Sequence, residues 1–321
     1  MQALRIRVRG QVQGVGFRPF VWQLAQRCNV VGHVLNDPEG VLIYAAGSDL
    51  QPFCAALQTD APPLAQVDAI ETEPHDFATP PGAFEIVNSQ GLGAETRVTP
   101  DAATCPDCAA DIFGQDPRRR GYAFTNCTHC GPRFTILRAL PYDRGQTTMA
   151  AFAMCPACAA EYRDPGDRRF HAQPVACAKC GPQVWYEKTG KRDSHAIRAA
   201  ARALLEGEIL AVKGLGGFHL CCDATNAAAI RLLRQRKMRP TKPLALMGTA
   251  AHVNEYADAS EREIEALRGP DAPIVLLRKR AGLPVELATG QSRLGWMLPY
   301  TPLHHLLLEA VERPLVMTSG N

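Results

Sequence analysis

The feature that most constrains this sequence is a set of eight cysteines arranged as four Cys-x-x-Cys pairs. In each half of the set, eighteen residues separate the two pairs, the second pair runs into Gly-Pro, and the whole module recurs after fifty residues. Two such pairs supply the four thiolates of a tetrahedral, structural zinc site. The sequence therefore predicts two structural zinc ions bound by Cys105, Cys108, Cys127, Cys130, Cys155, Cys158, Cys177 and Cys180.

The spacing leaves open how the four pairs share two ions. Sequential pairing is the simplest arrangement, and an interleaved one is the alternative. Eight unrelated thiols or a set of disulfides would not explain the identical spacing of the two copies. His129 and His171 lie close to the cysteines in sequence, but four sulfurs already complete each site, so we expect structural roles for both histidines.

The totals for the chain exclude several classes of protein. A length of 321 residues predicts two or three domains, and an apolar fraction of 46% is typical of globular proteins. The net charge of +3 is too small to indicate a polyanionic partner, and no apolar run is long enough to predict a membrane span. The N-terminus has no apolar signal core. Four further cysteines lie outside the pairs, namely Cys28, Cys54, Cys221 and Cys222, and unpaired thiols fit a reducing compartment. We therefore expect a cytoplasmic protein with no membrane partner.

Residues 1–90 predict a small α/β domain with the order β-α-β-β-α-β. Charged and aliphatic residues alternate in the first strand, and a helix after Pro19 has an apolar stripe at helical spacing. The remaining elements are strands at 30–35, 41–46, 67–71 and 84–87 and a helix near 50–57.

A glycine-bearing loop, residues 10–18, joins the first strand to the first helix. Glycines allow backbone N–H groups to turn inward, and a helix N-terminus favours an anion. Arg18 adds a planar, bidentate donor for a phosphoryl group. The loop therefore predicts an anion site.

The run from Val8 to Arg18 resembles the signature of the acylphosphatases, a ferredoxin-like family that hydrolyses carboxyl-phosphate anhydrides. The resemblance implies that Arg18 and the loop amides hold the phosphate and that Asn36 positions the attacking water. A turn residue that satisfies its own backbone is the other interpretation of Asn36; the resemblance favours the catalytic role. The implied mechanism needs no metal, only charge stabilisation and a positioned water. The implied phosphate loop is Gln13, Gly14, Val15, Gly16 and Phe17.

We expect a linker at 91–104 and the tandem zinc-finger region at 105–190. Arginines at 118–120 in the first module and at 168–169 in the second occupy equivalent places. Such arginines either bind nucleic acid, remain solvated or pack against a neighbouring domain.

Residues 191–321 predict an α/β domain. Ser194 is a candidate cap for a helix that ends at Gly207, followed by a strand at 209–213 and a glycine-rich turn at 214–219. Further elements are helices at 227–236 and 303–311 and strands at 244–247 and 274–278. Six cationic residues between Arg231 and Lys242 suit a nucleoside triphosphate or a nucleic acid, and charge alone does not decide between the two.

This region resembles the YrdC/Sua5 fold in the run Lys237–Pro240, in Lys242-Pro243 and in the terminal Thr318–Asn321. Members of that family make mixed anhydrides of the carbamoyl-adenylate type from ATP. The sequence stops directly after Asn321, so we expect a domain that is incomplete at its C-terminal end. The resemblance implies ATP as co-substrate, with Mg²⁺, and a nucleotide or carbamoyl site formed by Lys237, Arg239, Lys242, Ser319 and Asn321.

The order of an acylphosphatase-like domain, paired four-cysteine modules and a YrdC-like domain resembles the hydrogenase maturation carbamoyltransferases, the HypF family. The resemblance implies an α+β multidomain enzyme that hydrolyses carbamoyl phosphate and adenylates the carbamate with ATP. In that family a further domain passes the carbamoyl group to the C-terminal cysteine of HypE, where it becomes a cyanide ligand of a [NiFe] centre. These 321 residues contain no candidate for that domain, so we expect this chain alone not to carbamoylate HypE.

Two other hypotheses come from different classes of protein. A zinc-ribbon nucleic-acid-binding protein linked to tRNA threonylcarbamoylation would use Arg118–Arg120 and the Arg231–Lys242 cluster, and its RNA binding would depend steeply on salt. That hypothesis gives no role to Arg18 or Asn36, so we do not expect a nucleic-acid partner. Alternatively, the first domain is a docking module without turnover.

Overall fold

The computed structural model describes residues 2–91 and 97–320. It contains two compact units: unit 1 comprises Met1–Asp101 and Asn126–Gly181, and unit 2 comprises Ala102–Thr125 and Pro182–Asn321. Asn321, one of the predicted ligand-binding residues, and part of the predicted linker lie outside the described residues. Among the described residues, no helix has both the length and the hydropathy needed to cross a bilayer.

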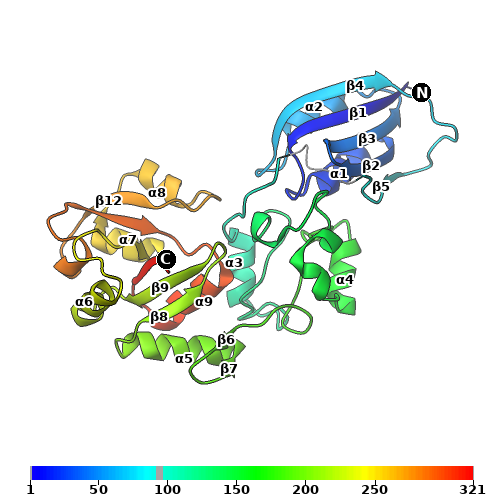
Figure 1. Ribbon diagram of the computed structural model, residues 1–321. Coiled ribbons are helices and arrows are strands. Elements are labelled where there is room, and N and C mark those ends of the chain that lie inside the picture. Colours follow the sequence, from blue (N-terminus) through cyan, green and yellow to red (C-terminus); the bar gives the residue numbers. More distant parts are fainter. Residues whose placement is uncertain (1, 92–96, 321) are drawn as a thin grey trace. The chain divides into compact units, whose positions relative to one another are not determined.

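The N-terminal part of unit 1 is a five-stranded sheet of order β4-β1-β3-β2-β5 with two helices (Figure 1). Strand β1 pairs antiparallel with β3 and β4, whereas β2 pairs antiparallel with β3 and parallel with β5. This topology confirms the predicted ferredoxin-like domain. The elements are β1 (Gln2–Gln11), α1 (Phe17–Arg27), β2 (Val31–Asp37), β3 (Gly40–Gly47), α2 (Gln51–Thr59), β4 (Gln66–Pro74) and β5 (Phe84–Ile86).

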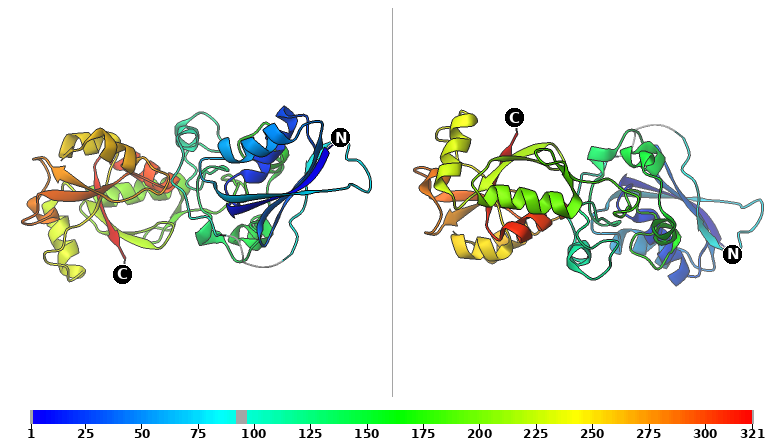
Figure 2. Two further views of the ribbon diagram at one scale, coloured as in Figure 1. Left: turned by 90° about the horizontal axis from the view of Figure 1, so that it is seen from above. Right: turned by 90° about the horizontal axis from the view of Figure 1, so that it is seen from below.

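The alternating pattern of β1 explains its burial. Ile6 and Val8 are fully buried on the face that packs against both helices, and Leu24 of α1 and Phe53 of α2 meet them in the same core. Figures 1 and 2 show both helices on one face of the sheet. The sheet and the two helices therefore fix the start of α1, where the predicted anion loop ends.

The rest of unit 1 is mostly irregular and is built around the cysteines. It contains three short 3-10 turns, η1 (Phe134–Ile136), η2 (Arg144–Gln146) and η3 (Thr148–Ala151), and one helix, α4 (Pro156–Arg163). Cys155 is the N-cap of α4, and Cys105 is the N-cap of α3 (Pro106–Phe113) in unit 2 with nearly the same backbone angles. The sequence repeat is therefore also a repeat in local structure.

Unit 2 is a seven-stranded mixed sheet of order β11-β12-β13-β10-β14-β9-β8 between two layers of helices (Figure 1). Its strands are β8 (Leu210–Lys213), β9 (Phe218–Asp223), β10 (Leu246–Met247), β11 (Ala257–Asp258), β12 (Val275–Lys279), β13 (Arg293–Met297) and β14 (Leu315–Ser319). The helices are α3, α5 (Asp193–Leu205), α6 (Ala227–Arg236), α7 (Ala250–Tyr256), α8 (Glu261–Leu267) and α9 (Pro302–Val311), with η4 (Val285–Leu287) and a hairpin of β6 (Trp185–Tyr186) and β7 (Lys191–Arg192).

Neighbouring residues of the central strands enter different cores, as the period of two requires. In β13, Trp296 packs in the core with α6, α7 and α8, whereas Met297 packs in the core with α5 and α9. The two-sided burial confirms the α/β architecture predicted for this region.

One local prediction in unit 2 is wrong. Ser194 does not cap α5, because the helix already begins at Asp193 and its N-cap is Arg192, without a side-chain cap bond. The reason is that β7 ends at Arg192 and leads directly into the helix.

Candidate phosphate site and cysteine clusters

The loop after β1 has the conformation that its glycines permit. Gly14 and Gly16 have φ angles of 74° and 77°, and Gly16 is the N-cap of α1. The N–H groups of Gly14, Val15 and Gly16 donate to no other group within the described residues. The amides of Phe17 and Arg18 are in the first helical turn, where no intrahelical acceptor exists. The loop and the helix start therefore present several free donors to an anion.

Arg18 and Asn36 lie together at this loop. Asn36 is at the end of β2 and is 1% exposed, and Arg18 is 8% exposed. With the Asn36 amide oriented so that its oxygen faces the guanidinium, it accepts from Arg18 Nη2 and Nε at 3.3 and 3.2 Å. The amide –NH₂ of Asn36 then remains as a donor beside the guanidinium.

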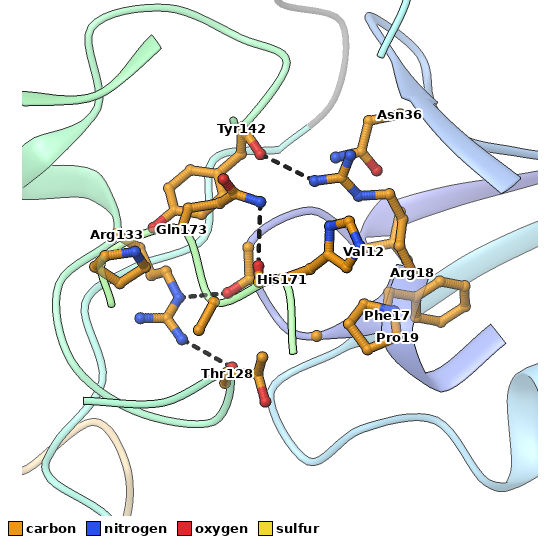
Figure 3. Close-up of a pocket in the computed structure, with 14 residues that line it drawn as sticks. Val12, Phe17, Arg18, Pro19, Asn36, Thr128, Arg133, Tyr142, His171 and Gln173 are labelled. Atoms are coloured by element: carbon orange, nitrogen blue, oxygen red, sulfur yellow. Dashed lines mark hydrogen bonds between the residues drawn. The ribbon is translucent and has the colours of Figure 1, made fainter. Parts of the chain in front are cut away.

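A pocket in unit 1 lies between this loop and the segment that carries the second halves of both cysteine modules (Figure 3). Arg18 Nη2 donates to Asp143 Oδ1 at 2.7 Å, and Arg18 Nη1 donates to Ser89 Oγ at 3.2 Å. The guanidinium is therefore already partnered, by a carboxylate on one side. The pocket is lined by Val12, Gly14, Gly16, Phe17, Arg18, Pro19, Asn36, Thr128, Arg133, Tyr142, His171, Ala172, Gln173 and Pro174.

The wall opposite Arg18 is held by its own hydrogen bonds. Gln173 is 3% exposed and donates from Nε2 to the His171 carbonyl at 3.1 Å, while its Oε1 accepts from the Arg144 amide at 2.8 Å. Burial lowers the pKa of His171 to about 4, with a further contribution from the nearby Arg18. Burial raises the pKa of Tyr142. At neutral pH this wall is thus uncharged, and Arg18 and Arg133 are the cations of the pocket.

The eight paired cysteines form two separate clusters, Cys105, Cys108, Cys127 and Cys130, and Cys155, Cys158, Cys177 and Cys180. Within each cluster the sulfurs lie within 4.8 Å of one another. Neighbouring sulfurs are 3.7–3.9 Å apart, too far for a disulfide. A tetrahedral zinc ion with Zn–S bonds of about 2.3 Å places its sulfurs about 3.8 Å apart, so both clusters fit zinc. The grouping is the sequential one.

The thiols of the second cluster are also suited to a cation. Burial opposes ionisation of Cys155, but hydrogen bonds from Cys158, Cys177 and Cys180 outweigh it and lower the pKa of Cys155 to about 7. Neither His129 nor His171 joins a cluster; His171 lies instead at the pocket.

Three family models match successive parts of the chain. The model described as "Acylphosphatase" matches residues 4–86, the "HypF finger" matches 104–137 and 154–187, and the Sua5/YciO/YrdC model, described as "Telomere recombination", matches 202–321. The carbamoyltransferase HypF of Rhodobacter capsulatus is 64% identical over 322 residues, which are 100% of this chain and 43% of that protein. The carbamoyltransferase HypF of Rhizobium leguminosarum bv. viciae is 50% identical, and the match covers 100% of this chain and 42% of that protein.

The chain belongs to the HypF family. It spans less than half the length of these HypF relatives. A crystal structure of full-length HypF in the phosphate- and nucleotide-bound form superimposes with a TM-score of 0.92 at 41% identity, covering 100% of this chain and 43% of that one. The acylphosphatase of Archaeoglobus fulgidus is 45% identical over 76 residues, 23% of this chain and 84% of that protein, so the first domain belongs to the acylphosphatase family.

In this HypF-family chain, the predicted ligand-binding residues of unit 2 meet only in part. Lys237 Nζ donates to the Ser319 carbonyl at 2.6 Å, and Arg239 Nη1 donates to Thr318 Oγ1 at 3.2 Å, so both cations reach the end of β14. For Lys242, the structure shows an exposed residue whose carbonyl accepts from Arg234 Nη1 at 3.0 Å.

The finger arginines do not form one solvated surface. Arg119 and Arg169, at equivalent places in the two modules, are 0% and 6% exposed. Arg169 Nε donates to the Asn126 carbonyl at 3.1 Å. Buried guanidinium groups of this kind are not available to neutralise nucleic-acid phosphates, so these two arginines are neither solvated nor nucleic-acid ligands.

Sequence reasoning missed Arg133, Tyr142 and Gln173, which line the pocket, and Asp143, which pairs with Arg18. For Arg133 a signal existed. In both modules Gly-Pro follows the last cysteine, but the next residue is Arg133 in the first module and Gln183 in the second. A difference between two copies of one repeat is a reason to look for a role outside metal binding.

Proposed function

We propose that unit 1 hydrolyses carbamoyl phosphate to carbamate and phosphate. The observation that carries the proposal is the meeting of Arg18 and Asn36 at a glycine loop whose amides are free for an anion. The similarity to acylphosphatases at 45% identity and to carbamoyltransferases at 64% identity supports the reaction class and the carbamoyl group.

The residues divide the chemistry between them. The loop amides and Arg18 bind the phosphoryl oxygens and stabilise the charge that develops on them. The Asn36 –NH₂ donates to a water and holds it for attack on phosphorus. The new bond joins the water oxygen to phosphorus, the bond from phosphorus to the acyl oxygen breaks, and carbamate leaves with that oxygen and the bonding electrons. The two protons of the water pass to the phosphate product and the solvent.

We propose that unit 2 contributes to a nucleotide site for the next step, adenylation of carbamate by ATP with Mg²⁺. Lys237 and Arg239, placed at the end of β14, are the cations that would meet the phosphates. A solved HypF with nucleotide bound supports this assignment. Transfer to the C-terminal cysteine of HypE, in the cytoplasm, completes the proposed role of the full-length protein in hydrogenase maturation.

The experiment that tests the proposal is phosphate release from carbamoyl phosphate by this chain and by Arg18→Ala. The matched control is Arg27→Ala, an exposed arginine at the other end of α1 whose partner is Asp60. We expect turnover by the wild type and the control and loss of turnover in Arg18→Ala with both zinc ions retained. A wild-type chain that binds phosphate without turnover would indicate a docking module instead.

A further inference from the structure

We propose that Arg133 is a positioning residue that holds the phosphate loop from the side of the first cysteine module and thereby sets the phosphate affinity of the site. The inference rests on the proposed function of unit 1 and assigns part of that function to the finger region. Arg133 follows the Cys127–Cys130 turn and lines the pocket.

All three side-chain nitrogens of Arg133 donate hydrogen bonds to backbone carbonyls. It is 1% exposed, and its Nε donates to the carbonyl of Gly14 in the phosphate loop (Figure 3). The other two nitrogens donate to carbonyls of the module's own turn at 2.8–3.2 Å, namely those of Cys127, Thr128, Cys130 and Pro132. The side chain therefore joins the turn that carries two cysteines to the loop that would carry the phosphate.

The hydrogen bond from Arg133 to the Gly14 carbonyl also fixes the orientation of the next amide in the loop. A trans peptide is planar, with its C=O and N–H pointing in opposite directions, so fixing the Gly14 carbonyl also fixes the Val15 N–H. That N–H donates to no group within the described residues. The preceding peptide is fixed in the same way, because Thr99 Oγ1 donates to the Gln13 carbonyl. Arg133 thus pre-orients a donor that an unsupported loop would have to order on binding.

Packing restricts the loop on the same side. A Cβ added at Gly14 would lie 3.3 Å from Arg133 Cδ and 3.3 Å from Tyr142 Cδ1, and one added at Gly16 would lie 3.0 Å from Thr128 Cβ. The finger region therefore contacts the loop at two glycines. A displacement of the Cys127–Cys130 turn must also displace the loop or break these contacts.

Two observations separate this role from metal binding and from the acylphosphatase fold itself. The second module forms its cluster with Gln183 at the equivalent place, so the four-cysteine geometry does not require an arginine there. The acylphosphatase of Leuconostoc mesenteroides aligns over 97% of its length with only 24% of this chain, so almost nothing in it can correspond to residue 133. The contact is an addition to the acylphosphatase site.

The test measures binding of inorganic phosphate by calorimetry, beside zinc content and turnover of carbamoyl phosphate, for wild type, Arg133→Lys and Arg138→Lys. Lysine keeps the charge but cannot reach five carbonyls. Arg138 is an exposed arginine five residues along the chain and serves as the matched control. We expect Arg133→Lys to keep two zinc ions and to bind phosphate about tenfold more weakly, and Arg138→Lys to behave as wild type.

The same titration is repeated on the wild type after chelation of its zinc, so that a poorly folded variant does not decide the matter. We expect a loss of phosphate affinity at least as large as in Arg133→Lys. Unchanged phosphate affinity in Arg133→Lys with zinc retained, or in the zinc-free wild type, would overturn the inference while leaving the proposed hydrolysis intact. A wild type that binds phosphate without turnover would instead contradict the proposed hydrolysis.

Discussion

Replacing Asp143 by asparagine should increase the affinity of the site for inorganic phosphate. Asp143 Oδ1 accepts from Arg18 Nη2 at 2.7 Å, so a phosphate must compete with a carboxylate for the same guanidinium. The Arg18 side chain is 9% exposed and that of Asp143 is 32% exposed. For such a partly buried, hydrogen-bonded ion pair we take about 1–2 kcal/mol, which lies between the values typical of exposed ion pairs and of hydrogen bonds to charged groups. Without this competition, the phosphate dissociation constant of Asp143→Asn should be about five to thirty times lower than that of the wild type.

The assay is calorimetric titration of wild type and Asp143→Asn with phosphate at low ionic strength, where the charge effect is least screened. Asp60→Asn is the matched control, because Asp60 pairs with Arg27 of the same helix at 2.9 Å but outside the pocket. Affinity that is unchanged or weaker in Asp143→Asn, with the control at the wild-type value, would refute the reasoning. It would mean that Asp143 orients Arg18 for the anion and does not compete with it.

Two further predictions concern the water and the pH dependence of stability. Asn36→Ala should lower kcat for carbamoyl phosphate by about 10²-fold and change the phosphate dissociation constant much less, because in the proposed mechanism Asn36 holds the water and Arg18 holds the anion. Equal losses in a steady-state and a binding assay would contradict that division. Burial, with smaller effects of His219 and His305, lowers the pKa of His304 to about 3, so below pH 6.5 the unfolded chain binds a proton that the folded chain does not. The free energy of unfolding in urea should therefore decrease from pH 6.5 toward acid more steeply in wild type than in His304→Leu, and parallel slopes would exclude His304 as a cause.

The parts of the site that could be predicted from the sequence are those encoded over short distances. The strand, the glycine loop, Arg18 and the helix lie within a few residues of one another, and Cys-x-x-Cys spacing specifies a chelating turn directly. Asn36 was predicted from a resemblance, and β2 does bring it to Arg18.

The residues that close the pocket could not be predicted in that way. Asp143 meets Arg18 across 125 residues, and Arg133 meets Gly14 across 119. Such contacts depend on how the finger segment packs against the sheet domain within unit 1, and no periodicity in either segment encodes that packing. The prediction that Ser194 caps a helix was wrong for a related reason, because the adjoining hairpin determines where α5 begins.

The most direct test of the account is the origin of the oxygen in the released phosphate. Carbamoyl phosphate is turned over by this chain in water enriched in ¹⁸O, with Arg18→Ala as the measure of spontaneous breakdown. A water held by Asn36 and attacking phosphorus predicts one ¹⁸O atom in each phosphate that the wild type releases above that background. Enzyme-dependent phosphate without ¹⁸O would place the attack on the carbonyl carbon and contradict the proposed roles of Arg18, Asn36 and the loop.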